Sequence, residues 1–177
     1  MSFDRRKFLE GLVAASTTQL MPSHGWAASP TSHAITLGQF EITVFSDGHL
    51  TIPTRFLARN VSEADIKAWL GTTAAMVAPA TNVTLVRTPS ETILIDVGAG
   101  PHFMPGAGKL AENMEAAGFD RKAVTKVVFT HAHPDHIWGT LDDFDDEPMF
   151  PNASYVISGA KWNFWMADGV SASKFYK

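Results

Sequence analysis

The feature that most constrains this chain is a cluster of four side chains able to bind metal, three histidines and one aspartate, within residues 131–136, whose sequence is His-Ala-His-Pro-Asp-His. Residues 124–130, directly before it, are rich in β-branched and aromatic side chains, which is the composition of a strand. Pro134 cannot donate a hydrogen bond to a sheet, so the strand has to end before it. We therefore expect the cluster on a loop at the end of a strand.

The spacing within the cluster indicates two metal ions. His131 and His133 are two residues apart, and in extended chain such side chains point to the same side, where they can bind one ion. Asp135 and His136 follow at a turn, which aims them at a neighbouring position. A single histidine is more often a surface or core residue. Burying four such groups together without a metal would leave polar atoms unpartnered, at about 1–3 kcal/mol each.

We predict two divalent metal ions as cofactors, with Zn²⁺ as the usual choice for a site rich in imidazole. Iron, manganese or cobalt would also suit a site that contains a carboxylate, so the identity of the metal stays open. Two such ions roughly 3.5–4 Å apart lower the pKa of a shared water and supply hydroxide at neutral pH. The expected chemistry is hydrolysis by a metal-bound hydroxide, with Asp135 as the catalytic residue that orients it.

The N-terminus predicts export. Arg5 and Arg6 stand before Phe-Leu, an uncharged stretch follows from residue 11 to 21, and small residues near Ala27 offer a cleavage point. Residues 1–27 therefore read as a twin-arginine signal peptide, which engages the twin-arginine translocase and directs the protein to the periplasm or the outside, with no membrane attachment after cleavage. A short cytosolic amphipathic helix is the alternative. The absence of cysteine suits an oxidising destination without requiring one.

Residues 28–177 are expected to form a single domain. Its composition, with 45% hydrophobic residues and a mean hydropathy near zero, is that of a globular protein with a real core. Removing residues 1–27 would shift the formal net charge from −4 to −5. Nothing resembles a basic groove with interleaved aromatic residues, which argues against nucleic acid as a partner. A homodimer remains open.

Strands and helices alternate along the chain. The pattern predicts strands at 35–37, 40–45, 50–53, 82–87, 92–96, 124–130 and 154–158, a turn at 46–49, and helices at 62–70, 109–117 and 160–166. Such alternation indicates an α/β fold with the metal loop at the carboxyl edge of a sheet, where these sheets usually carry their sites.

Two segments in this order resemble the metallo-β-lactamase superfamily: Ile-Leu-Ile-Asp-Val-Gly-Ala-Gly at 93–100, and Thr-His-Ala-His-Pro-Asp-His at 130–136. Within that superfamily, residues 38–48 and 150–153 are similar to secreted methyl parathion hydrolases and their lactonase relatives. The resemblance covers about residues 35 to 177 and implies an αβ/βα sandwich with a dinuclear site.

The resemblance also implies roles for single residues. It assigns His131 and His133 to one metal, Asp135 and His136 to the other, and gives Asp96 a supporting role beside the metal loop. For Asp96, an ordinary carboxylate at a turn is the alternative.

The chain departs from the family pattern in two ways. It has Trp138-Gly139 where relatives usually have a glycine pair, and no histidine follows His136, although the family completes its site with ligands far downstream. Other acids are weak substitutes, namely Asp142, Asp143, Asp145, Asp146, Glu147 and Asp168. We therefore expect a sandwich truncated after its first half. Such a chain would expose the inner face of its sheet and be marginally stable and poorly active on its own.

Aromatic residues suggest the substrate class. Several follow the motif and could line an apolar pocket, although most aromatic residues at such spacing belong to a core: Trp138, Phe150, Trp162, Phe164 and Trp165. They favour a small hydrophobic lactone, ester or phosphotriester. His49 and His102 are candidates for the outer part of the site, although surface turns explain them equally well.

Other function classes stay open. A β-lactam hydrolase would use the same nucleophile, and a thioester hydrolase is disfavoured because it would be expected in the cytosol. The non-enzyme alternative is a catalytically incomplete exported metal-binding module.

Overall fold

The computed structural model describes residues 31–71, 74–142 and 147–167 of the chain, so the predicted signal peptide, 1–27, lies outside the described residues. The helices and strands in chain order are β1 (Ser32–Leu37), β2 (Phe40–His49), β3 (Ile52–Pro53), α2 (Thr54–Leu57), α3 (Glu63–Leu70), β4 (Met76–Val77), β5 (Ala80–Arg87), β6 (Thr92–Ile95), α4 (Leu110–Ala116), the 3₁₀ helix η1 (Arg121–Ala123), β7 (Lys126–Val128), α5 (Pro134–Ile137), the 3₁₀ helix η2 (Trp138–Thr140), β8 (Ser154–Val156) and α6 (Gly159–Trp165). None of the described helices is long and apolar enough to cross a membrane.

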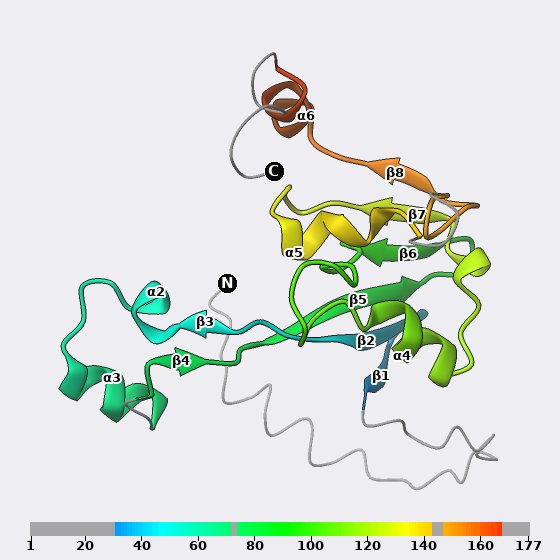
Figure 1. The fold of residues 1–177 in the computed structure, drawn as a ribbon. Helices are drawn as coiled ribbons and strands as arrows, with labels where there is room; N and C mark the ends of the chain where they lie inside the picture. The colour runs from blue at the N-terminus through cyan, green and yellow to red at the C-terminus, as the bar shows by residue number, and fades with distance from the viewer. Residues whose placement is uncertain (1–30, 72–73, 143–146, 168–177) are drawn as a thin grey trace, which may run out of the picture.

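A six-stranded sheet forms the body of the molecule, in the order β1-β2-β5-β6-β7-β8 (Figure 1). The first four strands are antiparallel, and β6, β7 and β8 run parallel to one another. Parallel strands place their carboxyl ends at one edge of a sheet. The segment after β6 therefore lies beside the segment after β7, which carries the histidine motif.

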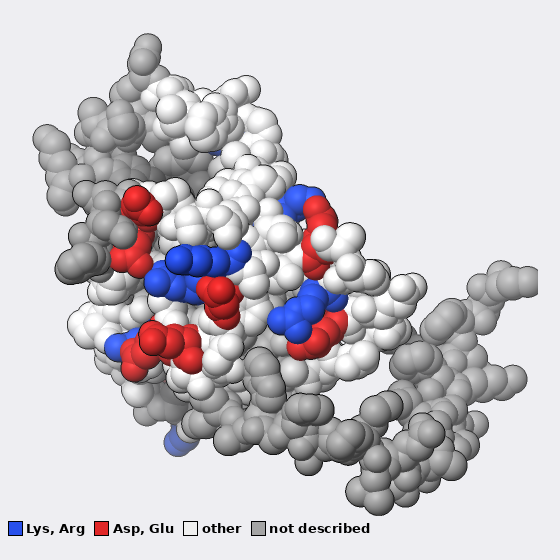
Figure 2. Space-filling model, turned by 90° about the vertical axis from the view of Figure 1, so that its right-hand side faces the viewer, with Lys and Arg blue, Asp and Glu red and all other residues white. Residues whose placement is uncertain are grey.

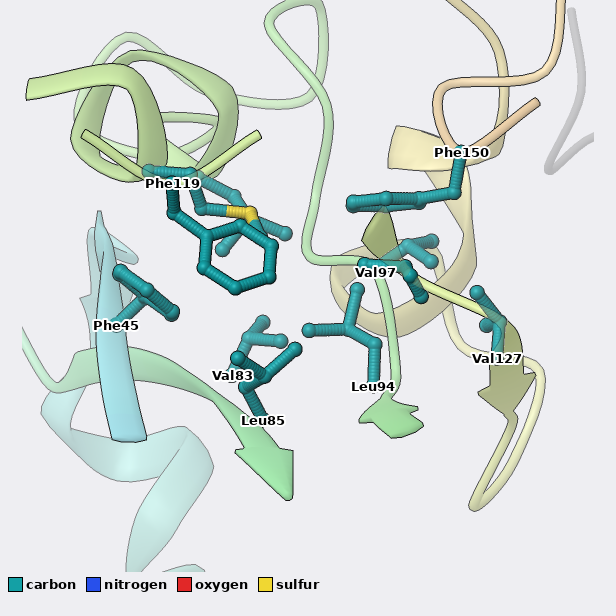
Figure 3. Packing of buried hydrophobic residues seen from close by; sticks show 11 residues of the cluster. Phe45, Val83, Leu85, Leu94, Val97, Phe119, Val127 and Phe150 are labelled. Atoms are coloured by element: carbon teal, nitrogen blue, oxygen red, sulfur yellow. The ribbon is translucent and has the colours of Figure 1, made fainter. Parts of the chain in front are cut away.

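One face of the sheet holds the hydrophobic core. The strand register brings Phe45 beside Val83 and Leu94 beside Val127 on this face, and α4 covers it with Leu110 and Met114. Figure 3 shows Phe119 and Phe150 above the valines and leucines of the strands, with Phe45 of β2 at one side of the cluster. Burying each large apolar side chain stabilises the fold by roughly 1.5–3 kcal/mol, which makes this layer the main source of stability.

The opposite face of the sheet is also apolar, but the described residues leave it largely uncovered. Cross-strand pairing places ten apolar side chains there, none of them buried: Ile35, Leu37, Phe40, Ile42, Val44, Val86, Ile93, Ile95, Val128 and Val156. This is the exposed sheet face that the sequence predicts for the first half of a sandwich.

An arm made of β3, α2, α3 and β4 extends from the sheet (Figure 1). The predicted helix at 62–70 is confirmed as α3, and its ends have the expected chemistry. The Ser62 hydroxyl accepts a hydrogen bond from the Asp65 backbone at 3.2 Å, and Gly71 ends the helix with φ of 68°. No residue of α3 is buried.

The expected turn at 46–49 is wrong. Strand β2 continues to His49, because a register shift between Ser46 and Gly48 lets the chain bend without leaving the sheet. Gly48 takes φ of 96°, and a Cβ there would lie 2.1 Å from the Gly106 carbonyl oxygen. The bulge therefore allows the end of β2 to pass close to the loop that precedes α4.

Charged side chains of both signs are interspersed on the face that Figure 2 displays. Three ion pairs join separate segments of the described chain: Arg87 with Glu41 at 3.1 Å, Lys126 with Glu91 at 2.6 Å, and Arg121 with Asp142 at 3.1 Å.

Candidate metal centre

The histidine motif lies where the sequence predicts, directly after a strand at the carboxyl edge of the sheet. His131 and His133 belong to the extended segment after β7, and His133 is the N-cap of α5, with φ −79° and ψ 151°. Pro134 occupies the first turn of this helix, where its missing N–H costs nothing. Asp135 and His136 follow in the same turn. The change from extended chain to helix thus separates the motif into two pairs of side chains.

The fold brings the four side chains of the motif together. The ring centroids of His131 and His133 are 4.5 Å apart, and those of His131 and His136 are 3.9 Å apart. Nε2 of His136 lies 3.3 Å from Oδ2 of Asp135. The imidazole and carboxylate donors of the motif therefore lie close together, and the shortest ring contact, between His131 and His136, joins the two predicted pairs. The assignment of each pair to its own ion stays a prediction.

Asp96 reaches this cluster from the end of β6. Its Oδ1 accepts a hydrogen bond from the Thr130 backbone at 2.8 Å, and its Oδ2 accepts one from the Thr130 hydroxyl at 2.7 Å and lies 2.8 Å from Nδ1 of His136. Among the described residues, Asp96 is the only residue other than glycine with a positive φ, 62°. Such a backbone costs an ordinary residue about 1–2 kcal/mol, so the contacts of this carboxylate hold a strained turn in place. Its supporting role at a metal site stays a prediction.

No three His, Asp or Glu side chains in residues 31–71, 74–142 and 147–167 are arranged around one common ion position. The predicted arrangement requires only two donors per ion from this segment, so the donor set still suits two divalent cations. Imidazole and carboxylate are the ligands that zinc takes in hydrolytic sites. Nδ1 of His131 and Nδ1 of His136 both have hydrogen-bonding neighbours, which leaves Nε2 of each ring for a metal.

The electrostatics of the cluster favour the neutral imidazole at His131. The pKa of His131 is lowered from its usual value, first because burial disfavours the charged ring and then because His136 and His133 repel a proton on it. The nearby carboxylates act in the opposite direction but do not outweigh these effects. A neutral ring has the free electron pair that a metal needs.

A hollow of about 340 Å³ adjoins the Asp135 and His136 side of the motif. Its lining includes Asp96 and Asp47, and the second of these was not predicted from the sequence, where it reads as part of a turn. Asp47 is 1% exposed, and its carboxylate accepts hydrogen bonds from the backbone of Ala99 at 2.8 Å and of Leu110 at 3.0 Å. Burial raises its pKa, although the backbone donors oppose the rise.

Glycines let the backbone of residues 97–100 pack against the segment after the motif. A Cβ on Gly139 would lie 2.2 Å from the Val97 carbonyl oxygen, and one on Gly100 would lie 2.7 Å from the Trp138 carbonyl oxygen. The Trp138 ring packs edge-on against Phe103 at 5.5 Å between centroids. The departure from a glycine pair at this position thus keeps the one glycine that the close approach requires.

A second hollow, of about 320 Å³, adjoins the other side of the motif. Its lining joins the motif to α6: His131, Ala132, His133, Ala160, Lys161, Phe164 and Trp165.

The five aromatic residues proposed for a pocket divide between four environments. Phe164 and Trp165 line the second hollow, while Phe150 is buried in the core, Trp138 packs on the loop, and Trp162 is 54% exposed. Neither His49 nor His102 lines the two hollows beside the motif.

Two of the downstream acids, Asp142 and Glu147, lie in the described part of the chain, and neither lines the two hollows beside the motif. Asp142 pairs with Arg121 at 3.1 Å, and its backbone N–H donates to the Glu147 carbonyl oxygen at 2.7 Å. Asp143, Asp145, Asp146 and Asp168 lie outside the described residues.

Comparison with known families decides the identity of the fold. The family model of the metallo-beta-lactamase superfamily matches residues 77–171, which is more than half of the chain and includes the whole motif. The chain belongs to the metallo-beta-lactamase superfamily. The predicted fold class, an α/β sandwich of the metallo-β-lactamase type, is confirmed. A comparison with curated protein sequences gives no match.

Three solved structures show the same fold. AidC, described as a dizinc quorum-quenching lactonase, is 32% identical with a TM-score of 0.69, and the alignment covers 76% of this chain and 47% of AidC. AbOPH, a hydrolase of the beta-lactamase superfamily, is 27% identical with a TM-score of 0.71, covering 80% and 49%. A probable metal-dependent hydrolase from Staphylococcus aureus shares the fold at 18% identity with a TM-score of 0.67, covering 81% and 55%. The chain thus spans about half the length of these structures. The names of AidC and AbOPH agree with the predicted hydrolase class.

Proposed function

We propose that this protein is a metal-dependent hydrolase of neutral lactones or related esters that carry an apolar group. The observation that carries the proposal is the hollow beside the motif, where Phe164 and Trp165 of α6 add an aromatic wall to a lining that also holds His131, His133 and Lys161. AidC, a lactonase by name, supports the same substrate class at 32% identity. A phosphotriester is the alternative substrate. The description of AbOPH says only that it is a hydrolase, so it does not favour either substrate class.

Two divalent cations, which we propose to be Zn²⁺, would activate water and polarise the substrate oxygen when bound. His131 and His133 would hold one ion, and Asp135 and His136 the other. The residues of the chain contribute positioning. Asp135 lies 3.3 Å from Nε2 of His136, close enough to orient a water molecule at the same position. The aromatic rings of α6 would bind the apolar part of the substrate and keep bulk water away from the reacting bond.

The relative rates at which the purified, metal-supplemented chain hydrolyses different substrates test this proposal, because the sequence predicts low absolute activity for this chain on its own. We expect hydrolysis of N-acyl homoserine lactones and much less turnover of methyl parathion and of nitrocefin. Lactone hydrolysis is monitored by pH-stat titration of the acid that it releases. H131A should abolish turnover, whereas H33A should retain it, because His33 is an exposed residue of β1. Preferential cleavage of nitrocefin would favour a β-lactam hydrolase. Metal binding without any turnover would favour a metal-binding module, and both results contradict the proposal.

The aromatic hollow makes a sharper prediction about substrate length. Phe164 is 60% exposed and lines the hollow, and F164A removes its ring. Each buried methylene of a substrate contributes about 0.8 kcal/mol, so this variant should raise KM for long acyl chains by about tenfold and leave short-chain lactones almost unchanged. F56A, on the distant arm and 61% exposed, is the matched control. An equal loss for short and long chains would refute the assignment of this hollow.

We also propose that residues 1–27 direct export through the twin-arginine translocase and that the protein works in the periplasm or outside the cell. The adjacent Arg5 and Arg6 support this. A folded reporter fused behind residues 1–30 should be exported, and the R5K/R6K fusion should stay in the cytoplasm. Equal export of both fusions would contradict the proposal.

A further inference from the structure

The hydroxyl of Thr130 stands between the carboxylate of Asp96 and the first histidine of the motif. Its Oγ1 lies 2.7 Å from Oδ2 of Asp96 and 3.0 Å from Nδ1 of His131. The backbone N–H of the same residue donates to Oδ1 of Asp96 at 2.8 Å, so both groups of Thr130 face one carboxylate. This residue belongs to neither metal pair, and the motif pattern gives it no role.

The number of available protons decides the direction of these hydrogen bonds. A carboxylate only accepts hydrogen bonds, so the single hydroxyl proton of Thr130 has to point at Asp96. The contact with His131 is then a hydrogen bond only if Nδ1 of the ring carries a proton and donates it to Oγ1. A neutral ring with its proton on Nδ1 has its free electron pair on Nε2.

The same carboxylate sets the second ring directly. Nδ1 of His136 lies 2.8 Å from Oδ2 of Asp96, which again requires the proton on Nδ1 and leaves Nε2 for other partners. That Nε2 lies 3.3 Å from Asp135, the residue paired with His136 in the motif. Asp96 thus contacts one histidine directly and the other through a hydroxyl.

We propose that Thr130 is a positioning residue whose hydroxyl connects Asp96 to His131, so that one carboxylate fixes the tautomers of two metal-binding histidines and leaves Nε2 of each free for metal. The inference rests on the proposed function only in taking His131 and His136 as metal ligands. Hydrogen-bonding partners of this kind typically change metal affinity by about 10–100-fold when they are removed.

The tautomers can be read without metal and without substrate. Long-range ¹H–¹⁵N correlation spectra of the metal-free wild-type chain at about pH 8, above the usual histidine pKa of about 6.5, should show His131 with its proton on Nδ1. In T130V, which keeps the shape of the side chain and lacks the hydroxyl, this preference should be lost. In T130S, the matched control, it should be retained. His136 should keep its proton on Nδ1 in both variants.

A third variant tests whether the carboxylate of Asp96 fixes the tautomers of both histidines. Asparagine tolerates a positive φ, so D96N should keep the backbone at this position. Its amide nitrogen cannot accept the two hydrogen bonds that Oδ2 receives, so Thr130 should turn its proton toward His131. Both His131 and His136 should then shift toward the tautomer with the proton on Nε2.

Zinc affinity, measured by competition with a chromophoric chelator, provides the second readout. T130V should bind Zn²⁺ about 10–100-fold more weakly than wild type, and T130S should bind within about threefold of it. A proton on Nε2 of His131 in the wild-type spectrum would overturn the proposal, as would a T130V variant with unchanged tautomer and zinc affinity. Failure of lactone hydrolysis alone would leave these spectra unchanged, which separates the two proposals.

Discussion

Replacing Gly98 by alanine tests how the buried carboxylate of Asp47 and the backbone beside the motif depend on each other. Gly98 has φ of 75°, and a Cβ there would lie 2.6 Å from Cγ of Asp47. Gly118 is the matched control, because its φ is 71° and a Cβ there would meet nothing within 4 Å. G118A should therefore cost only the strain of the left-handed backbone, about 1–2 kcal/mol.

G98A should lower the free energy of unfolding by more than G118A, because it also displaces the carboxylate of Asp47. In addition to the same strain, the new methyl group displaces a carboxylate that accepts hydrogen bonds from Ala99 at 2.8 Å and Leu110 at 3.0 Å. Each buried N–H left without a partner costs about 1–3 kcal/mol. We expect G98A to be about 2–5 kcal/mol less stable than G118A.

Urea unfolding followed by tryptophan fluorescence measures this difference. With a slope of about 2 kcal/mol per molar urea, the midpoint of G98A should lie at least about 1 M below that of G118A. In a D47A background the clash is absent, so the same glycine substitution should cost only the backbone strain. Equal midpoints for G98A and G118A, or an undiminished cost in the D47A background, would refute the reasoning.

Three further outcomes are expected. Burial raises the pKa of Asp47, so the native state holds its proton more tightly than the unfolded chain; the stability from this group is fully present below about pH 3.9 and is lost as the pH rises through the raised value. D47N cannot titrate, so urea titrations should show it losing stability relative to wild type as the pH falls from 7 toward 4. F150A should destabilise the protein by about 3–5 kcal/mol, because its ring is completely buried, whereas F164A should change the unfolding free energy by less than about 0.5 kcal/mol; equal effects in thermal melts would contradict the described core. E91Q should cost less than about 1 kcal/mol and less still at 1 M salt, since Glu91 and Lys126 form a partly exposed pair at 2.6 Å; a large cost that is independent of salt would show that the pair is not screened.

Much of the fold can be predicted from the sequence, because local chemistry marks the ends of elements. Ser62 and Gly71 bound α3 as capping rules predict, alternating apolar residues locate β5, and a continuous apolar run locates β6. The turn expected at 46–49 is wrong because a bulge lets β2 bend while it stays paired with β5. Such a bulge depends on the partner strand and leaves little trace in the local sequence.

The candidate site also has a part that the local sequence predicts and a part that depends on long-range contacts. His131, His133 and His136 lie within six residues, so their spacing alone indicates a metal site. The contact of Asp47 with Ala99 spans 52 residues, and that of Asp96 with Thr130 spans 34. These contacts arise from strand order and register. The family resemblance of residues 93–100 predicts that Asp96 lies beside the metal loop, whereas nothing in the sequence predicts the contact of Asp47. The hydroxyl that directly precedes His131 is the one signal that could have suggested Thr130.

The glycines that let residues 97–100 touch the segment after the motif have a consequence for mutational scans. Gly100 and Gly139 have no side chain that could bind a metal or a substrate. A side chain at either position would nevertheless collide with a neighbouring carbonyl group and shift the backbone that carries the histidines. A survey of single substitutions scored by enzyme function would therefore rank these two positions with the proposed metal ligands. Thermal stability and metal content measured side by side would separate them, since variants of the proposed ligands should lose metal while remaining folded.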